Sequence, residues 1–154
     1  MFPDTTQIDS SGTLNIGGCN TLDLANEYGT PLYVFDEDTI RNRCRSFVQE
    51  FQKRVPETQV VYASKAYINP VLVRMLTEES LGLDVVSGGE LAVAIAGGLS
   101  PTQVYFHGNN KAPQELREAV QQGIGRIVVD SFHELQLLDE ISGELGKKQE
   151  ILVR

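Results

Sequence analysis

The chain has 154 residues, of which 13 are Lys or Arg and 21 are Asp or Glu, so its formal net charge is −8. This acidic balance excludes the basic surface of a nucleic-acid-binding protein and argues against a basic helix that lies on a membrane. Only two cysteines, no apolar run of about 18 residues and no signal-like N-terminus together predict a cytoplasmic protein without a membrane segment.

The segment before Pro31 differs in character from the rest of the chain. Leu14 to Gly18 predict a short strand followed by a turn, and Leu22 to Tyr28 predict a short helix. We therefore divide the chain into an N-terminal segment, residues 1–30, and a second region, residues 31–154.

The second region alternates short apolar runs with amphipathic helical patterns. The expected strands are Leu32–Phe35, Val60–Ala63, Leu83–Val86, Val104–Phe106, Arg126–Val129 and Ile151–Val153. Their starts follow one another at nearly regular intervals, and each interval is the size of one βα unit. The runs are almost entirely apolar, as strands of a covered parallel sheet must be.

Helix signals fill the intervals between these strands. An apolar face predicts a helix after the first strand, and Asn69 followed by Pro70 is typical of an N-cap with proline at the first helical position. Ser87 and Ser131 are each followed three positions later by a glutamate, which is the pattern of a capping box. A further helix is expected from Pro113 to Gly123.

These elements predict an α/β fold, either a doubly wound sheet or part of a (β/α)8 barrel. A complete barrel needs about 250 residues. The chain ends within its sixth predicted strand, so we expect about five and a half βα units of a longer protein.

Ligands bind at the C-terminal ends of the strands in both fold types. In this sequence those ends carry polar groups in Asp36, Ser64–Lys65, Asp84–Ser87, His107 and Asp130–Ser131. We interpret Asp36, Asp130 and Ser131 as helix caps, because a helix begins directly after each of these strands.

Lys65 has no capping use, because an ammonium group cannot accept a hydrogen bond. Asp84 follows it at a separation close to one βα unit, so the two side chains are expected on neighbouring strands. Two interpretations stay open at this point. Lys65 is either a desolvated amine for Schiff-base chemistry or one half of a structural ion pair with Asp84.

His107 ends the fourth predicted strand and could stabilise a bound anion or only hydrogen-bond its loop. Gly88–Gly89 lacks the flanking pattern of a phosphate-binding loop. The sequence shows neither metal-ligand spacing nor a Ser-His-Asp or Cys-His arrangement.

Three motifs resemble the diaminopimelate decarboxylases, members of the barrel-type, alanine-racemase-like enzymes that depend on pyridoxal 5′-phosphate (PLP). They are Tyr62–Ala66, Gly82–Leu91 and Phe106–Lys111, and segments Gly29–Val34 and Arg126–Ser131 are also similar. The resemblance extends from about Leu14 to the end of the chain and implies a partial TIM barrel, with residues 1–30 contributing to a β-domain.

The same resemblance implies that Lys65 is the Schiff-base lysine that holds PLP, with Asp84 beside it and His107 near the cofactor. It implies decarboxylation of meso-2,6-diaminopimelate to L-lysine and CO2 by a cytoplasmic homodimer. The family's phosphate loop, its partner for the pyridine nitrogen and the segment completing the site across the dimer would lie beyond Arg154. We therefore expect residues 1–154 alone to be inactive.

Alternatives remain at the level of the sequence. An arginine or ornithine decarboxylase, or an alanine racemase, would share a lysine at this strand end. A non-catalytic PLP-binding paralogue or a structural βα domain with a Lys65–Asp84 ion pair are the non-enzymatic possibilities.

Overall fold

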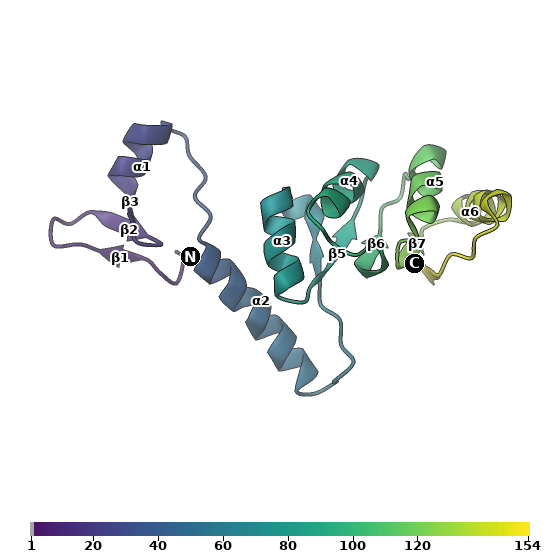
Figure 1. Cartoon of the computed structure of the whole chain (residues 1–154), viewed down its shortest axis with the longest axis horizontal. Coiled ribbons are helices and arrows are strands. Elements are labelled where there is room, and N and C mark those ends of the chain that lie inside the picture. Colours follow the sequence, from purple (N-terminus) through teal and green to yellow (C-terminus); the bar gives the residue numbers. More distant parts are fainter. Residues whose placement is uncertain (1) are drawn as a thin grey trace. The chain divides into compact units, whose positions relative to one another are not determined.

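The computed structural model describes residues 2–154 in two compact units, one ending at Arg54 and the other running from Val55 to Arg154 (Figure 1). The N-terminal unit holds an antiparallel sheet with the strand order β1-β2-β3. Its elements are β1 (Gln7–Ile8), β2 (Leu14–Ile16), β3 (Cys19–Asn20), α1 (Thr21–Tyr28) and α2 (Glu37–Gln52). The strand and the short helix expected before Pro31 are present as β2 and α1. The predicted boundary between residues 30 and 31 concerns the complete protein and stays a prediction.

Local side-chain bonds explain where the helices of this unit begin. The Asn20 side chain accepts hydrogen bonds from Leu22 N and Asp23 N and caps α1. The Asp36 carboxylate accepts one from Thr39 N at 2.8 Å and caps α2, as predicted. Its second oxygen accepts a hydrogen bond from the Thr5 hydroxyl at 2.8 Å.

The strand expected at Leu32–Phe35 is wrong for this structure. These residues do not form a strand and are exposed, with Tyr33 at 90% of its full accessible surface. An aromatic and β-branched run favours extended backbone, but a strand also needs a neighbour that pairs with it. Within the described residues, no strand pairs with this segment.

The C-terminal unit is a five-stranded parallel sheet with the strands in sequence order, β4-β5-β6-β7-β8. The later predicted strands all agree with it to within a single position at either end. The strands are β4 (Val61–Ala63), β5 (Gly82–Val85), β6 (Val104–Phe106), β7 (Arg126–Val129) and β8 (Ile151–Val153). The helices between them are α3 (Pro70–Glu78), α4 (Gly88–Ala96), α5 (Pro113–Gln122) and α6 (Phe132–Leu145), with short 3-10 turns η1 (Ser64–Ala66) and η2 (Pro101–Gln103).

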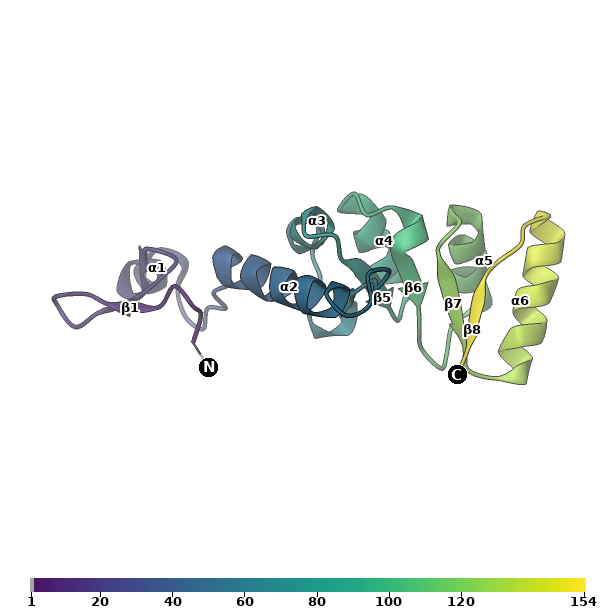
Figure 2. The same cartoon turned by 90° about the horizontal axis from the view of Figure 1, so that it is seen from below.

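The topology decides between the two predicted architectures. Each helix of this unit packs against the next one along the chain, so the four helices cover the same face of the sheet (Figures 1 and 2). A doubly wound sheet would reverse its strand order and place helices on both faces. Sequential parallel strands with helices on one face are the arrangement of a TIM barrel segment.

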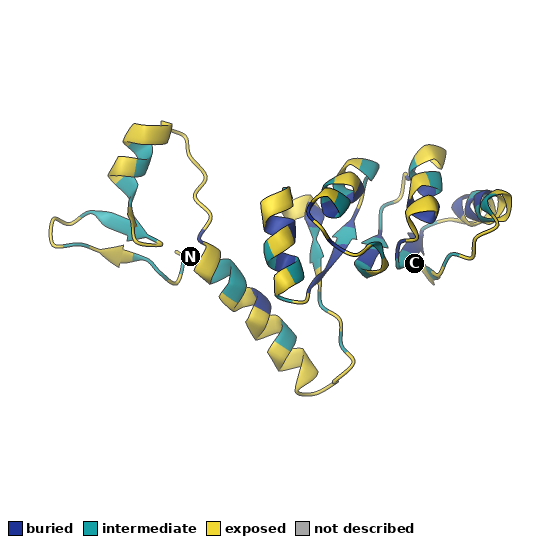
Figure 3. Cartoon of the chain, in the orientation of Figure 1, coloured by how far each residue is buried: buried dark blue, intermediate teal, exposed yellow. Residues whose placement is uncertain are grey.

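The core lies between this sheet and its helices. Figure 3 shows buried residues concentrated in β5 to β7 and on the inner sides of α3 to α6. Leu83, Val85 and Phe106 are fully buried on the helix-covered face. The row that pairs across the sheet on the opposite face, Ala63, Asp84, Tyr105 and Arg126, is only half-buried.

Candidate functional site

Lys65, Asp84 and His107 come together at the C-terminal ends of three adjacent strands. Ala63 pairs with Asp84, and Asp84 pairs with Tyr105 on the other side. Lys65 is the second residue after Ala63, and His107 is the second residue after Tyr105. Lys65, after β4, and His107, after β6, therefore lie on either side of Asp84 and slightly nearer the rim. The sequence spacing predicted this neighbouring position for Lys65.

Asp84 is an acid in a partly buried position. Burial raises its pKa above the ordinary value of 3.8, and the charges of His107 and Lys65 act in the opposite direction. Its Oδ1 atom is buried and has no hydrogen-bond partner within the described residues. A half-buried carboxylate oxygen that receives no hydrogen bond can accept one from a ligand or from a side chain that moves toward it.

Lys65 lies in η1, directly after β4, and its side chain is exposed. Within the described part of the chain it makes no hydrogen bond and no close ion pair, so the structural ion pair with Asp84 does not form. The loop that carries Lys65 is nevertheless held in place, because the Tyr62 hydroxyl donates to Tyr67 O at 3.0 Å and Asn69 Nδ2 donates to the Tyr67 hydroxyl at 3.0 Å. An amine that makes no hydrogen bond or ion pair, on a loop that is held in place, can act as a nucleophile.

His107 is half-buried, and its backbone extends the sheet. Its amide donates to Val85 O at 2.8 Å, which ties the end of β6 to β5. The next residue, Gly108, has φ +107°, and a Cβ there would lie 3.3 Å from Val86 O. Glycine is thus required at this position for the chain to leave the strand beside β5.

The capping interpretation holds for Ser131 and not for Asp130. The Ser131 hydroxyl accepts a hydrogen bond from Glu134 N at 3.1 Å and begins α6. Asp130 Oδ1 instead lies 2.9 Å from Arg154 Nη1 in an ion pair. This ion pair links the ends of β7 and β8. The sequence around Asp130 does not indicate it, because Arg154 is distant along the chain.

Gly88–Gly89 does not form a phosphate cradle. Gly88 N–H donates to Glu115 Oε1 at 2.6 Å, and Ser87 Oγ accepts from Glu90 N at 3.2 Å. Two of the amide groups that an anion would need at the start of α4 are therefore already bonded.

The sequence prediction missed a buried ion pair at the same rim. Lys111 Nζ lies 2.9 Å from Glu134 Oε1, with side-chain exposures of 0% and 8%. The predicted capping box would return the Glu134 carboxylate to the start of its own helix, but that carboxylate contacts Lys111 instead. The available signal was a lysine in the Phe106–Lys111 motif with no other assigned role.

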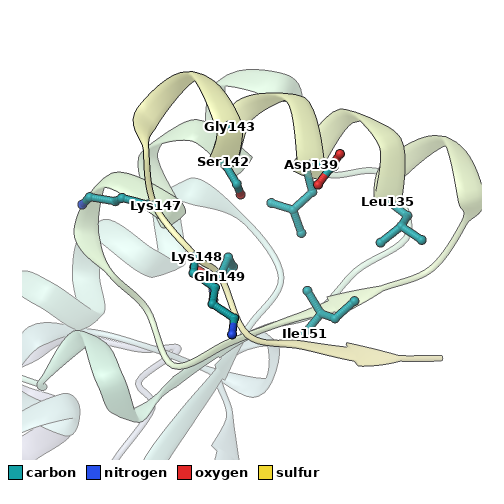
Figure 4. Close-up of a pocket in the computed structure, with 9 residues that line it drawn as sticks. Leu135, Asp139, Ser142, Gly143, Lys147, Lys148, Gln149 and Ile151 are labelled. Atoms are coloured by element: carbon teal, nitrogen blue, oxygen red, sulfur yellow. The ribbon is translucent and has the colours of Figure 1, made fainter.

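A groove beside α6 is a different feature. It has a volume of about 410 Å³ and lies between α6 and the segment that leads into β8 (Figure 4). Its lining is mixed aliphatic and polar, and it includes none of Lys65, Asp84 and His107. Leu135 of α6 and Ile151 of β8 line it, and these are the last helix and the last strand of the unit. We therefore attribute this groove to the gap between the last helix and the last strand and not to a reaction centre.

The three rim residues offer an amine, a carboxyl group and an imidazole, with the amine and the imidazole each within electrostatic reach of the carboxyl group. This set can bind a carbonyl compound covalently and control the charge of the resulting nitrogen. No group of three or more His, Cys, Asp or Glu side chains that could hold a metal occurs in residues 2–154. Among the helices of that range, none has the length and apolar character needed to cross a bilayer.

Comparison with known proteins gives a family for this arrangement. Residues 37–154 match the family "Pyridoxal-dependent decarboxylase, pyridoxal binding domain". The diaminopimelate decarboxylase of Bacillus methanolicus is 48% identical over 153 residues, which are 99% of this chain and 35% of that protein. The chain thus spans about a third of the length of the curated relatives it matches.

Solved structures agree with the family match. A crystal structure of diaminopimelate decarboxylase from M. jannaschii in complex with L-lysine has a TM-score of 0.88 and 33% identity, covering 98% of this chain and 36% of that one. A lysine/ornithine decarboxylase from Vibrio vulnificus in complex with putrescine has a TM-score of 0.72 and 25% identity, covering 87% of this chain and 35% of that one. Both the TIM barrel segment and the decarboxylase resemblance are thereby confirmed.

Proposed function

The chain belongs to the pyridoxal-dependent decarboxylase family, and we propose that it supplies the cofactor-lysine portion of a diaminopimelate decarboxylase, which converts meso-2,6-diaminopimelate to L-lysine and CO2. The observation that carries the proposal is the free Lys65 amine at the strand ends, flanking Asp84 in a chain that is 48% identical to a diaminopimelate decarboxylase. The proposal includes a cytoplasmic homodimer, with residues 1–30 in a β-domain and residues 31–154 in the barrel.

Lys65 is proposed to bind the cofactor aldehyde through its Nζ atom. The residues fit such a group, because Nζ has no partner to displace among the described residues and Asp84 Oδ1 has no donor there. When bound, PLP supplies a protonated ring that accepts the electron pair left on the α-carbon as CO2 departs. The remaining residues act on charge and position.

Asp84 is proposed to set the charge of the Lys65 nitrogen. An acid beside an amine favours the protonated amine, and burial makes the acid itself easier to protonate. Asp84 would therefore be able to exchange a proton with the Lys65 Nζ atom. His107, on the other side of Asp84, is proposed to contact the cofactor.

The likeness to the lysine/ornithine decarboxylase suggests ornithine or lysine as an alternative substrate. That protein shares the fold and 25% identity, which is well below the 48% shared with the diaminopimelate enzyme of B. methanolicus. Ornithine and lysine lack the second carboxylate of diaminopimelate, so a direct comparison of these substrates distinguishes the two activities.

The proposed function can be tested in a chimera that joins residues 1–154 to the C-terminal two thirds of the B. methanolicus enzyme. We expect CO2 release from meso-diaminopimelate and none above background from ornithine, arginine or lysine. The matched control is the same chimera with Lys148→Ala, a substitution of an exposed lysine outside the candidate site. Release from ornithine in preference to diaminopimelate, or no release from a folded chimera that binds PLP, would overturn the proposal.

A further inference from the structure

The Lys111 ammonium group joins three elements at the rim of the sheet. It donates to Gly108 O at 2.5 Å in the loop after β6, and to Val128 O at 2.9 Å in β7. It also forms the ion pair with Glu134 on α6, and it lies 5.9 Å from the centre of the Phe106 ring. Two of its N–H donors are thus used on backbone carbonyls, and its charge is met by a carboxylate.

Burial makes this arrangement costly to build. An ammonium and a carboxylate removed from water lose hydration that their attraction only partly restores. A buried ion pair is therefore weak evidence for stability alone, and we interpret this one as fixing a particular local geometry. The two carbonyl groups bound by Lys111 indicate which geometry is fixed.

The residue held by these bonds is His107. Its amide is bonded to Val85 O on β5, and the carbonyl of the following residue is bonded to Lys111. The backbone on both sides of His107 is therefore held in place. Its amide is bonded to β5, and the loop that follows it is bonded through Lys111 to β7 and α6. The glycine at 108, with φ +107°, allows the turn but adds no rigidity of its own.

We propose that Lys111 and Glu134 form a positioning pair that keeps the His107 side chain beside Asp84. Neither residue is assigned a contact with the cofactor or the substrate, so neither is called catalytic. The inference rests on the proposed function and deepens it, because it takes His107 and Asp84 as members of that site. Asp84 on β5 and Lys65 after β4 are charged groups on the same rim as His107, and the Lys111–Glu134 ion pair contacts the loop that follows His107.

A merely structural role predicts something different. If Lys111 only attaches the β6 loop to α6, its loss would lower the stability of the protein but leave His107 and Asp84 equally coupled. The measurement must therefore report the coupling between these two side chains rather than stability or activity.

A double-mutant cycle read by NMR chemical shifts at one fixed pH isolates this coupling. The chain has two histidines, and the second one, His133, is exposed at the start of α6 and serves as an internal control. In the otherwise unchanged protein, Asp84→Asn removes a carboxylate beside His107 and should shift the ring resonances of His107. In a Lys111→Met background, we expect the same Asp84→Asn substitution to shift these resonances by at most about half as much. The ring resonances of His133 should not respond to Asp84→Asn in either background.

A second variant covers the case in which Lys111→Met does not fold. Lys111→Arg keeps the cation that pairs with Glu134, but a planar guanidinium cannot reproduce the contacts that a single nitrogen makes here. We expect a weakened response of His107 to Asp84→Asn in this variant as well. An undiminished response in either folded variant would overturn the proposal.

The outcome is separable from that of the proposed function. The NMR cycle needs no cofactor, so it can succeed even if the chimera proves inactive. Conversely, an active chimera with an undiminished His107 response would leave the proposed function intact and reduce Lys111 to a structural role.

Discussion

The polar groups at the N-terminal end of the parallel sheet bond to one another, whereas Lys65 and Asp84 at its C-terminal end do not. At the N-terminal end, the Tyr105 hydroxyl donates to Gln59 Oε1 at 3.1 Å and accepts from Arg126 Nη1 at 2.9 Å, while Arg126 Nη2 pairs with Glu150 at 3.2 Å. At the C-terminal end, Lys65 is unpaired and Asp84 Oδ1 has no donor among the described residues.

The contrast shows where stability and chemistry are located. Groups that bond to one another hold the strands together and have no capacity left for a ligand. Groups that remain unbonded weaken the fold but can engage a substrate or cofactor, so local inconsistencies mark functional positions. Changes at the N-terminal end should therefore affect stability, and changes at the C-terminal end should affect function.

The largest expected effect is the loss of all turnover in the chimera with Lys65→Ala. No other lysine of the C-terminal unit can take its place, because Lys147 and Lys148 line the groove beside α6 and Lys111 is buried in an ion pair. The free energy of unfolding should change by less than about 0.5 kcal/mol, since the side chain is exposed and unbonded. The measurement is CO2 release together with urea denaturation, and turnover equal to that of Lys148→Ala would contradict it.

The second prediction disturbs the N-terminal end with Gly125→Ala. A methyl group at this position would strike the backbone carbonyl of Thr102, which cannot move away as a flexible side chain could. We expect a loss of about 1–3 kcal/mol in the free energy of unfolding, measured by urea denaturation. Gly143→Ala is the matched control, because a Cβ there meets nothing within 4 Å and alanine favours a helix. A Gly125→Ala variant as stable as Gly143→Ala would show that the strand starts are not tightly packed.

Tyr105→Phe makes a smaller change at the same end. It deletes the hydroxyl that joins Gln59 and Arg126 and should cost about 0.5–1.5 kcal/mol, with PLP binding unchanged. Tyr33→Phe is the control, because Tyr33 is 90% exposed and no loss is expected. If Tyr105→Phe instead reduced PLP binding, the separation between the two ends would be wrong.

The smallest expected effect is a gain, from Asp84→Asn at the C-terminal end. Burial raises the pKa of Asp84 in the folded state above 3.8, so this group favours folding below that pH, and its contribution is lost as the pH rises through the folded value. At neutral pH the variant avoids burying a charge, and its Tm should rise by about 1–3 °C. Thermal unfolding at pH 7 and pH 3.5 checks the sign, because the gain should vanish at the lower pH. A lower Tm at pH 7 would contradict it.

Much of the fold and part of the site could be predicted from the sequence. Strands β6, β7 and β8 lie where apolar runs were expected, and Asn69, Ser87 and Ser131 cap helices as their spacing indicated. The adjacency of Lys65 and Asp84 followed from a separation of one βα unit. These features depend on local pattern and on a regular period.

Other features depend on neighbours that no local pattern reveals. The run at Leu32–Phe35 has the composition of a strand but belongs to neither of the two described sheets, and Asp130 pairs with Arg154 instead of capping a helix. The contact between Lys111 and Glu134 joins positions on different βα units, and either residue alone has an ordinary surface explanation. The roles of Lys65, Asp84 and His107 toward PLP stay predictions.

The central claim is that the open end of the sheet carries the cofactor lysine. The direct measurement is reduction of the protein with borohydride in the presence of PLP, followed by mass spectrometry of its lysine peptides. The account predicts a pyridoxyl group on Lys65, only sub-stoichiometric labelling of the exposed Lys148, and disappearance of the main label from the protein with Lys65→Ala. Equal labelling of Lys65 and Lys148 would contradict it.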